Sequence, residues 1–493
     1  MIRGALPACL CAATLAAQST SPRFPAGVAS GEVTAYSAVL WTYTRSALDL
    51  EVELARDAAF SSTVFRASTS ANAANGFTAK VEAWPLVPST TYYYRWKAGF
   101  EVSDTGRFRT APAASDTAGL RFVFAGDSDG TRIDGRPAYN EFEVLDAARR
   151  EDPDFFVYLG DTVYTDSGKR STGPAATLDE YRAAYLQNRT YPALLELMRS
   201  TSTYAVWDDH EFRNDFYPDG FGPALYRIGR QAFLEWMPVR DSFLPTGVEC
   251  AGPPMLRVIR WGVEAVLIVL DERSCRSPSA ARACRGSSGE PDLAPTLPAS
   301  VRALAGLRDP VSPACLAAIA DPTRTMLGRT QRELLFLVLR YFPARFKFVV
   351  SEVPMTRLYA LPYDRWEGYA AERETILRFI AGNRIPNVVF VAADLHATVL
   401  SPLSVELDGE TVPAATEIVT GPIAVDPLLS TLSSYPAFDP AYVKLLPPLA
   451  GVECADIEQM AYGVAEVDQG EARLAVKNKA GEILCEKVLG PPR

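Results

Sequence analysis

Both histidines of this 493-residue chain follow short apolar runs that end in carboxylates. His210 lies in the stretch TYAVWDDHEFRND (203–215), which carries four carboxylates, an asparagine and an arginine behind its apolar start. His396 lies in the tripeptide DLH (394–396), which follows the apolar run 388–391. Imidazole, carboxylate and amide groups are the ligands that Fe, Mn, Mg, Ca and Zn use in proteins. The spacing therefore indicates a metal centre.

Two further strand-like runs end in the same way. Residues 121–125 lead into GDSDG (126–130), and residues 154–159 lead into GDTVY (160–164). Because ligands of α/β proteins bind outside the carboxyl ends of the strands, we expect all four segments to meet at one edge. Two metal ions at such an edge can clamp a phosphoryl group and activate water. The candidate residues are Asp127, Asp161, Tyr164, Asp209, His210, Asn214, Asp394 and His396.

The elements that must position these residues predict an α/β core behind an all-β region. The first region alternates short β-type runs with turns, which is typical of a small β-sandwich. From about residue 119, apolar strands alternate with helices, which favours a sheet covered on both faces. The predicted units are a signal peptide (1–20), a β-sandwich (21–113), a catalytic domain (119–439) with a Cys/Pro-rich insertion of loop character (275–325), and a C-terminal β segment (440–493) that completes or caps the core.

Charge and targeting signals limit the class of protein. The formal net charge is −10, which argues against a nucleic-acid binder that neutralises phosphates. The N-terminal segment has a basic residue, a short apolar core and small residues, as in a secretory signal peptide. No apolar run is long enough to be a transmembrane helix. We expect a secreted or periplasmic protein, with lipid anchoring at Cys9 as an alternative.

Six of the eight cysteines lie beyond the predicted signal peptide. An even number in an exported chain fits up to three disulfides. Two of the six flank the C-terminal segment, and we predict the bridge Cys454–Cys485. The pairing among Cys250, Cys275, Cys284 and Cys315 stays open.

Several motifs of the chain resemble those of the PhoD-like alkaline phosphatases, in the metallophosphoesterase superfamily. They are FPAGVASGEVTAYSAVLWT, YLGDTVYTD, YAVWDDHEFRND, VLDERS, LGRTQRELL and VVFVAADLHAT, which together span nearly the whole mature chain. The resemblance implies an α/β fold with a four-layered αββα metallophosphatase core and an N-terminal immunoglobulin-like β-sandwich. It also implies that a metal-bound hydroxide hydrolyses phosphate esters at a cluster of Fe³⁺ and Ca²⁺ ions.

The resemblance further implies individual roles. Asp161 is expected to bridge two ions, Tyr164 to bind ferric iron, and Asp209 to hold calcium. Asn214, Asp394 and His396 are expected as further ligands, and His210 as a phosphate contact or general acid. The family commonly has a cysteine ligand where this chain has Asp127. Because a carboxylate is a harder ligand than a thiolate, Asp127 leaves Mn²⁺, Mg²⁺ or Zn²⁺ as alternatives for the first metal.

Two other functions are compatible with these residues. GDSDG matches G-x-S-x-G, so Ser128 could be the nucleophile of an SGNH-type esterase with Asp394 and His396 as partners. Alternatively, the strand-end cluster could hold a structural calcium ion in a binding protein without catalytic activity. The physiological substrate, the choice between monoester and diester, and the oligomeric state are not fixed by these residues.

Overall fold

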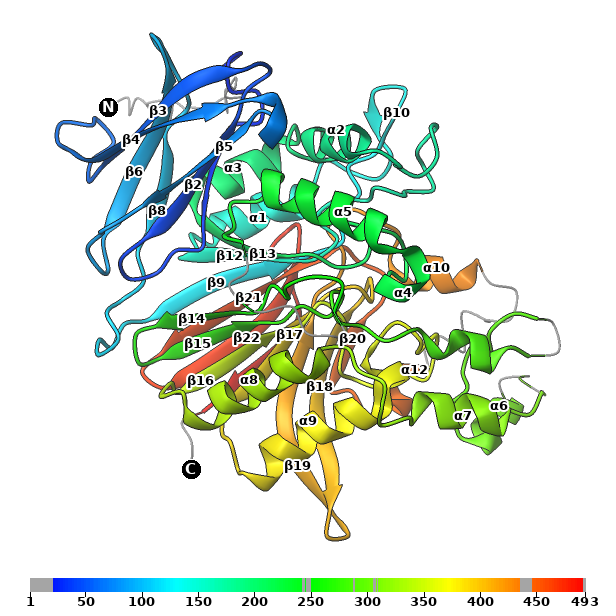
Figure 1. Cartoon of the computed structure of the whole chain (residues 1–493). Coiled ribbons are helices and arrows are strands. Elements are labelled where there is room, and N and C mark those ends of the chain that lie inside the picture. The colour runs from blue at the N-terminus through cyan, green and yellow to red at the C-terminus, as the bar shows by residue number, and fades with distance from the viewer. Residues whose placement is uncertain are drawn as a thin grey trace, which may run out of the picture.

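The computed structural model describes residues 21–241, 244, 250–286, 289–304, 307, 309–434 and 446–490. The predicted signal peptide and Cys9 lie outside these residues. The catalytic part has four layers, with helices on the outer face of each of two stacked sheets (Figure 1). This arrangement confirms the αββα architecture that the motifs implied.

The first sheet has nine strands and carries three of the four candidate segments. In spatial order it contains β23 (Ile483–Leu489), β22 (Glu471–Asn478), β21 (Ala461–Asp468), β9 (Leu120–Ala125), β12 (Phe155–Leu159), β13 (Ser202–Val206), β1 (Val28–Gly31), β2 (Ala38–Tyr43) and β5 (Thr78–Ala83). Strands β9, β12, β13 and β1 run parallel. In β9, Phe122 and Phe124 pack between the sheets, whereas Val123 and Ala125 pack under the helices. Burial on both faces explains why this strand is almost entirely apolar.

The second sheet has seven strands and carries the fourth segment. In spatial order it contains β14 (Arg257–Trp261), β15 (Ala265–Val269), β16 (Phe346–Val350), β17 (Val388–Ala392), β19 (Glu410–Val419), β18 (Thr398–Leu407) and β20 (Cys454–Asp456). Strands β15, β16, β17 and β19 run parallel. Aromatic and aliphatic side chains from both sheets, such as Phe122 and Phe348, fill the space between them.

Helices cover the outer face of each sheet. The first sheet packs against α1 (Glu143–Arg150), α2 (Leu178–Asn188), α3 (Pro192–Ser200) and α5 (Pro223–Trp236). The second packs against α8 (Gly328–Tyr341) and α9 (Ala370–Gly382). Helix α2 begins at a capping box in which Thr177 and Glu180 satisfy each other's backbone N–H groups. Shorter helical elements are η1 (Ala73–Asn75), α4 (Pro218–Phe221), η3 (Trp366–Tyr369), α10 (Leu428–Ser433) and α12 (Leu446–Leu449).

The insertion 275–325 is more helical than its composition suggested. It contains η2 (Ala280–Cys284), α6 (Ala299–Leu304) and α7 (Pro313–Ile319). The prediction of loop character was therefore only partly right, because the helical turns are too short to produce a clear helical period.

The N-terminal β-sandwich shares a sheet with the catalytic part. Its second sheet contains β4 (Thr63–Ala71), β3 (Leu48–Ala55), β6 (Thr91–Ala98), β7 (Glu101–Val102) and β8 (Gly106–Arg109). Its first sheet consists of β1, β2 and β5, and β1 pairs in parallel with β13, so that Ser30 lies opposite Ser202. Arg132–Ile133 (β10) and Arg136–Pro137 (β11) form a separate small hairpin. One sheet of the sandwich and the first sheet of the catalytic core are thus one continuous sheet.

The C-terminal segment contributes strands to both sheets. Strand β20 pairs with β18 in the second sheet, and β21, β22 and β23 extend the first sheet beyond β9. The disulfide Cys454–Cys485 joins β20 to β23 and therefore links the two sheets, which confirms the predicted pair. The other two bridges are Cys250–Cys275 and Cys284–Cys315.

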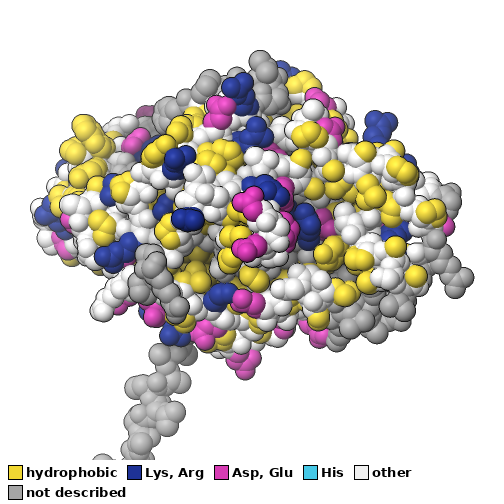
Figure 2. Space-filling view, turned by 90° about the horizontal axis from the view of Figure 1, so that it is seen from below, with side chains coloured by type: hydrophobic (Ala, Val, Ile, Leu, Met, Phe, Trp, Pro, Cys, Tyr) yellow, Lys and Arg dark blue, Asp and Glu magenta, His cyan; other side chains and the backbone are white. Residues whose placement is uncertain are grey.

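Within the described residues, no helix has the length and apolar character needed to cross a bilayer. Figure 2 shows the face seen from below, where basic and acidic side chains are dispersed among apolar ones without forming a broad patch of one sign.

Candidate metal centre

The candidate residues stand on backbone turns that most side chains avoid. Asp127, Asp161, Asp394 and His396 have φ values of 60°, 46°, 61° and 56°, in the left-handed region. Such conformations are uncommon outside glycine, and they cluster at functional sites. Gly160, at φ 73°, precedes Asp161, and a Cβ there would lie 2.6 Å from the Cβ of the next strand's Asp208. Glycine therefore allows the ends of β12 and β13 to approach each other.

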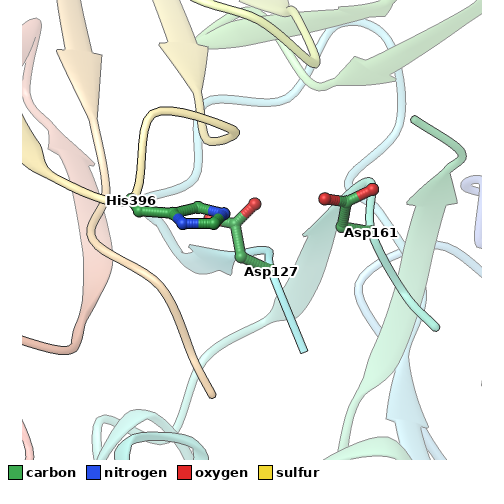
Figure 3. Close-up of side chains that lie close together, drawn as sticks. All are labelled: Asp127, Asp161 and His396. Atoms are coloured by element: carbon green, nitrogen blue, oxygen red, sulfur yellow. The ribbon is translucent and has the colours of Figure 1, made fainter. Parts of the chain in front are cut away.

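Asp127, Asp161 and His396 form one group of potential ligands. Their ligand atoms lie within 4.8 Å of one another, although they come from the turns after three different strands, β9, β12 and β17. Asp127 and His396 lie side by side and Asp161 faces them (Figure 3). Side chains that follow strands of both sheets therefore meet at one edge, as the strand-end pattern predicted.

A second group of potential ligands contains Asp161, Asp209 and His210, again within 4.8 Å of one another. Asp161 belongs to both groups, which is the arrangement that a carboxylate bridging two ions requires. A third group contains Asp209, Asp215 and Asp364. The sequence did not single out Asp364, which lies in a loop without a strand before it.

The chemistry of these carboxylates fits bound cations. Asp127 is fully buried, and its Oδ1 accepts a hydrogen bond from the backbone N–H of Asp394 at 3.1 Å. Among the described residues, its Oδ2 and the buried Oδ1 of Asp209 have no hydrogen-bond partner. Burial raises the pKa of both Asp127 and Asp161 well above the usual range. Because buried, unpaired carboxylates are costly, cations between them would stabilise the site.

His396 and Tyr164 lie next to each other beside these carboxylates. The Nδ1 atom of His396 lies 3.1 Å from the carbonyl oxygen of Asp426, so Nδ1 carries the proton and Nε2 is left for a metal. Burial, and then the charge of His210, lower the pKa of His396 to about 4, which keeps the imidazole neutral. The hydroxyl of Tyr164 lies 3.3 Å from the Nε2 atom of His396.

His210 is held from two sides. Its Nδ1 lies 2.6 Å from Oδ1 of Asp166, and its ring stacks on Tyr164 with the centroids 4.0 Å apart. Burial lowers the pKa of His210, but the carboxylates of Asp161, Asp209 and Asp166 outweigh burial and raise it well above the usual value. Asp166 was missed at the sequence level, although it lies five residues after Asp161 in the motif YLGDTVYTD.

Two predicted ligands are less directly supported. Asn214 is exposed, and its backbone N–H donates to Oδ2 of Asp166 at 2.7 Å. Asp394 contributes its backbone N–H to Asp127, and burial and Asp208 raise the pKa of its carboxyl group well above the usual range. Their roles as ligands remain predictions.

Other acidic residues of the motif DDHE stabilise the strand ends through an ion pair and hydrogen bonds. Asp208 forms a buried ion pair with Arg273, whose Nε lies 2.5 Å from Oδ1 of the carboxylate. Glu211 accepts hydrogen bonds from the backbone N–H and hydroxyl of Thr162, both at 2.6 Å, and one from the N–H of Asp208. These contacts connect the turns that carry Asp161 and Asp209.

Ser128 is not available as a nucleophile. It is fully buried, and its hydroxyl contacts the hydroxyl of Tyr158 and the carbonyl oxygen of Asp161. The alternative of a serine esterase is therefore not supported, because the serine of the G-x-S-x-G match is buried in the core.

The chain is similar to known families and proteins. The sequence model of the PhoD-like phosphatase family matches residues 134–475, and that of its N-terminal domain matches residues 10–112. A curated protein named alkaline phosphatase D, from Bacillus subtilis (strain 168), is 27% identical over 428 residues. That alignment covers 78% of this chain and 66% of the relative, so the chain spans about two thirds of the relative's length.

Solved structures share the fold. A structure described as that of PhoD aligns with a TM-score of 0.75 and 22% identity, over 96% of this chain and 93% of the other. A purple acid phosphatase from yellow lupin seeds aligns with a TM-score of 0.57 and 11% identity, over 96% and 74% of the two chains. The two matched sequence models together extend over most of the chain, which therefore belongs to the PhoD-like phosphatase family.

Proposed function

We propose that this protein hydrolyses phosphate esters at a centre of at least two metal ions. The observation that carries the proposal is the double membership of Asp161, which lies within 4.8 Å of ligand atoms from Asp127 and His396 on one side and Asp209 and His210 on the other. A carboxylate in that position can bridge two ions, and two ions can clamp a phosphoryl group. The family membership supports the same reaction.

The ligands divide between two positions. Asp127, Asp161, Tyr164 and His396 would hold the first ion, with Nε2 of the imidazole as the nitrogen ligand. Asp161 and Asp209 would hold the second. We propose Asn214 and Asp394 as additional ligands on the strength of the family motifs. When bound, the ions would supply positive charge to the phosphoryl oxygens and lower the pKa of a water molecule.

His210 would contact the substrate. Its Nδ1 is engaged with Asp166, so Nε2 is the atom that can donate to a phosphoryl oxygen or to the leaving group. The carboxylate of Asp166, which is not among the proposed ligands, favours the charged form of the ring, and this suits a general acid. Asp166 would act as a positioning residue, because its two oxygens accept from Nδ1 of His210 and from the backbone N–H of Asn214.

We propose Fe³⁺ with Ca²⁺ for this centre, with Mn²⁺, Mg²⁺ or the less hard Zn²⁺ as alternatives. The described cysteines are all in disulfides, so the first ion would have carboxylate, phenolate and imidazole ligands without a thiolate. Oxygen-rich sites favour hard ions. A phenolate bound to ferric iron would give a visible charge-transfer band.

The three disulfides indicate folding in an oxidising compartment outside the cytoplasm. We propose export through the N-terminal signal and action on an extracellular or periplasmic phosphate ester.

Chelation tests the reaction directly. Dialysis against EDTA should abolish hydrolysis of p-nitrophenyl phosphate and of its diester bis-p-nitrophenyl phosphate, and added metal should restore it. A serine-directed fluorophosphonate should leave the rates unchanged. Activity that survives complete metal removal, checked by elemental analysis, would contradict the proposal.

A further inference from the structure

A charged cavity lies in the second sheet's half of the molecule. Its volume is about 610 Å³, and it is bordered by the loop after β16, helix α9 and strand β18. Helix α9 and β18 pack against each other, low in the view of Figure 1. Three arginines line this cavity, Arg357, Arg373 and Arg378, against two carboxylates, Glu374 and Glu406. The cavity is thus positively charged in a chain of net charge −10.

Arg373 is unusual because it is buried without a counter-ion. Only 6% of its surface is exposed, and its Nε donates to the carbonyl oxygen of Met355. No described carboxylate forms an ion pair with it, and its remaining guanidinium N–H groups have no hydrogen-bond partner among the described residues. Buried arginines are ordinarily paired, since an uncompensated buried charge is costly.

The carboxylates of Glu417, Glu367 and Glu374 offset the burial of Arg373 only in part. Arg357 lines the same cavity, is exposed, and makes no ion pair or hydrogen bond with any described residue. Burial, and then the charge of Arg357, lower the pKa of Arg373 to about 10. Glu374 is paired with Arg378 at 2.7 Å, and Glu406 accepts from the hydroxyl of Thr411.

Two carboxylates near the cavity, Glu417 and Glu367, accept hydrogen bonds from backbone N–H groups. Both oxygens of Glu417 accept backbone N–H groups, from Met355 at 2.6 Å and Thr356 at 2.7 Å. Glu367 accepts the N–H groups of Leu358 and Tyr359. These carboxylates fix the loop after β16, which carries Arg357, and neither forms an ion pair with Arg373 on α9.

We propose that this cavity binds a phosphate group between Arg357 and Arg373. Two guanidinium groups offer the forked donors that tetrahedral oxyanions accept, and a bound dianion would compensate the buried charge of Arg373. The choice of phosphate over other oxyanions rests on the proposed function, whereas the anion site itself does not. The phosphate is either free inorganic phosphate or a second phosphate group of a substrate that carries several.

Calorimetric titration of the metal-loaded protein with inorganic phosphate tests the site. The wild type should bind phosphate at a site besides the metal centre, and Arg357→Gln should weaken that site roughly tenfold to a hundredfold, the value of one charge-assisted hydrogen bond. Arg340→Gln is the matched control, because Arg340 is an exposed arginine of α8 outside the cavity. Arg373→Gln should have the same effect as Arg357→Gln, and Arg357→Gln decides the question if Arg373→Gln does not fold.

Kinetics distinguish the two sources of phosphate. If the site takes a second phosphate of the substrate, Arg357→Gln raises KM for an oligomeric phosphodiester about tenfold and leaves KM for p-nitrophenyl phosphate unchanged. If it takes free phosphate, the variant changes inhibition by phosphate and neither KM. A titration in which wild type and Arg357→Gln bind phosphate with the same stoichiometry and affinity would overturn the site. Because binding is read without turnover, an inactive protein would refute the proposed function and not this site.

Discussion

Replacing Asp166 by asparagine tests the proposed role of His210. The two oxygens of Asp166 accept from two different donors, Nδ1 of His210 at 2.6 Å and the backbone N–H of Asn214 at 2.7 Å. An amide has only one acceptor oxygen, so its NH₂ group must face one of the two donors. The side chain of Asp166 is 5% exposed, so water does not replace the lost bond. We expect a loss of about 2 kcal/mol of transition-state stabilisation, or roughly thirtyfold in kcat.

The assay compares kcat and KM of wild type, Asp166→Asn, His210→Ala and the double variant on p-nitrophenyl phosphate, with metal content measured in each. KM should stay within twofold, because Asp166 does not contact the substrate, and kcat is compared per bound metal because Asp166 also holds the backbone of the proposed ligand Asn214. The double variant should be no slower than His210→Ala, since Asp166 acts through the imidazole. Asp154→Asn is the matched control, because Asp154 precedes β12 at the end opposite the site and should keep the wild-type kcat. A kcat for Asp166→Asn within twofold of wild type, or additive losses in the double variant, would refute the role.

Four further outcomes are expected. His396→Ala should lower the bound metal per chain in elemental analysis, and unchanged stoichiometry would exclude the imidazole as a ligand. Tyr164→Phe should abolish any visible absorption band of the iron-loaded protein, and a band that persists would mean that the phenolate is not bound to iron. Ser128→Ala should keep kcat within about twofold and lower the free energy of unfolding by about 1 kcal/mol, because the variant loses a buried hydroxyl contact. Loss of activity in a folded variant would instead support the serine mechanism. Removing the Cys454–Cys485 bridge, which spans 31 residues, should cost about 4 kcal/mol in urea unfolding, and a change below about 1 kcal/mol would contradict the crosslink.

The sequence predicted the parts of the site that depend on local pattern. Strands that are apolar on both faces, such as Ala265–Val269, were recognisable because burial on both sides leaves no polar position. The carboxylates and histidines behind them were expected at one edge for a topological reason, and Asp127, Asp161 and His396 do meet there.

The missed residues lack such a pattern. Asp364 reaches Asp209 from a loop between β16 and α9, and nothing in its own neighbourhood indicates the approach. Strand β18 contains Pro402 and polar residues, so its sequence does not predict a strand. The pairing of Ser30 with Ser202 joins distant parts of the chain, and local periodicity carries no information about such partners.

That same pairing has a consequence for the order in which the chain can fold. Strand β1 is synthesised before its parallel partner β13, so one edge of the sandwich stays open until the chain beyond residue 200 has emerged. Non-local parallel pairing is slow because the intervening loop must close first. A truncated version lacking the sandwich would leave β13 as an exposed edge with free N–H and C=O groups and a tendency to aggregate.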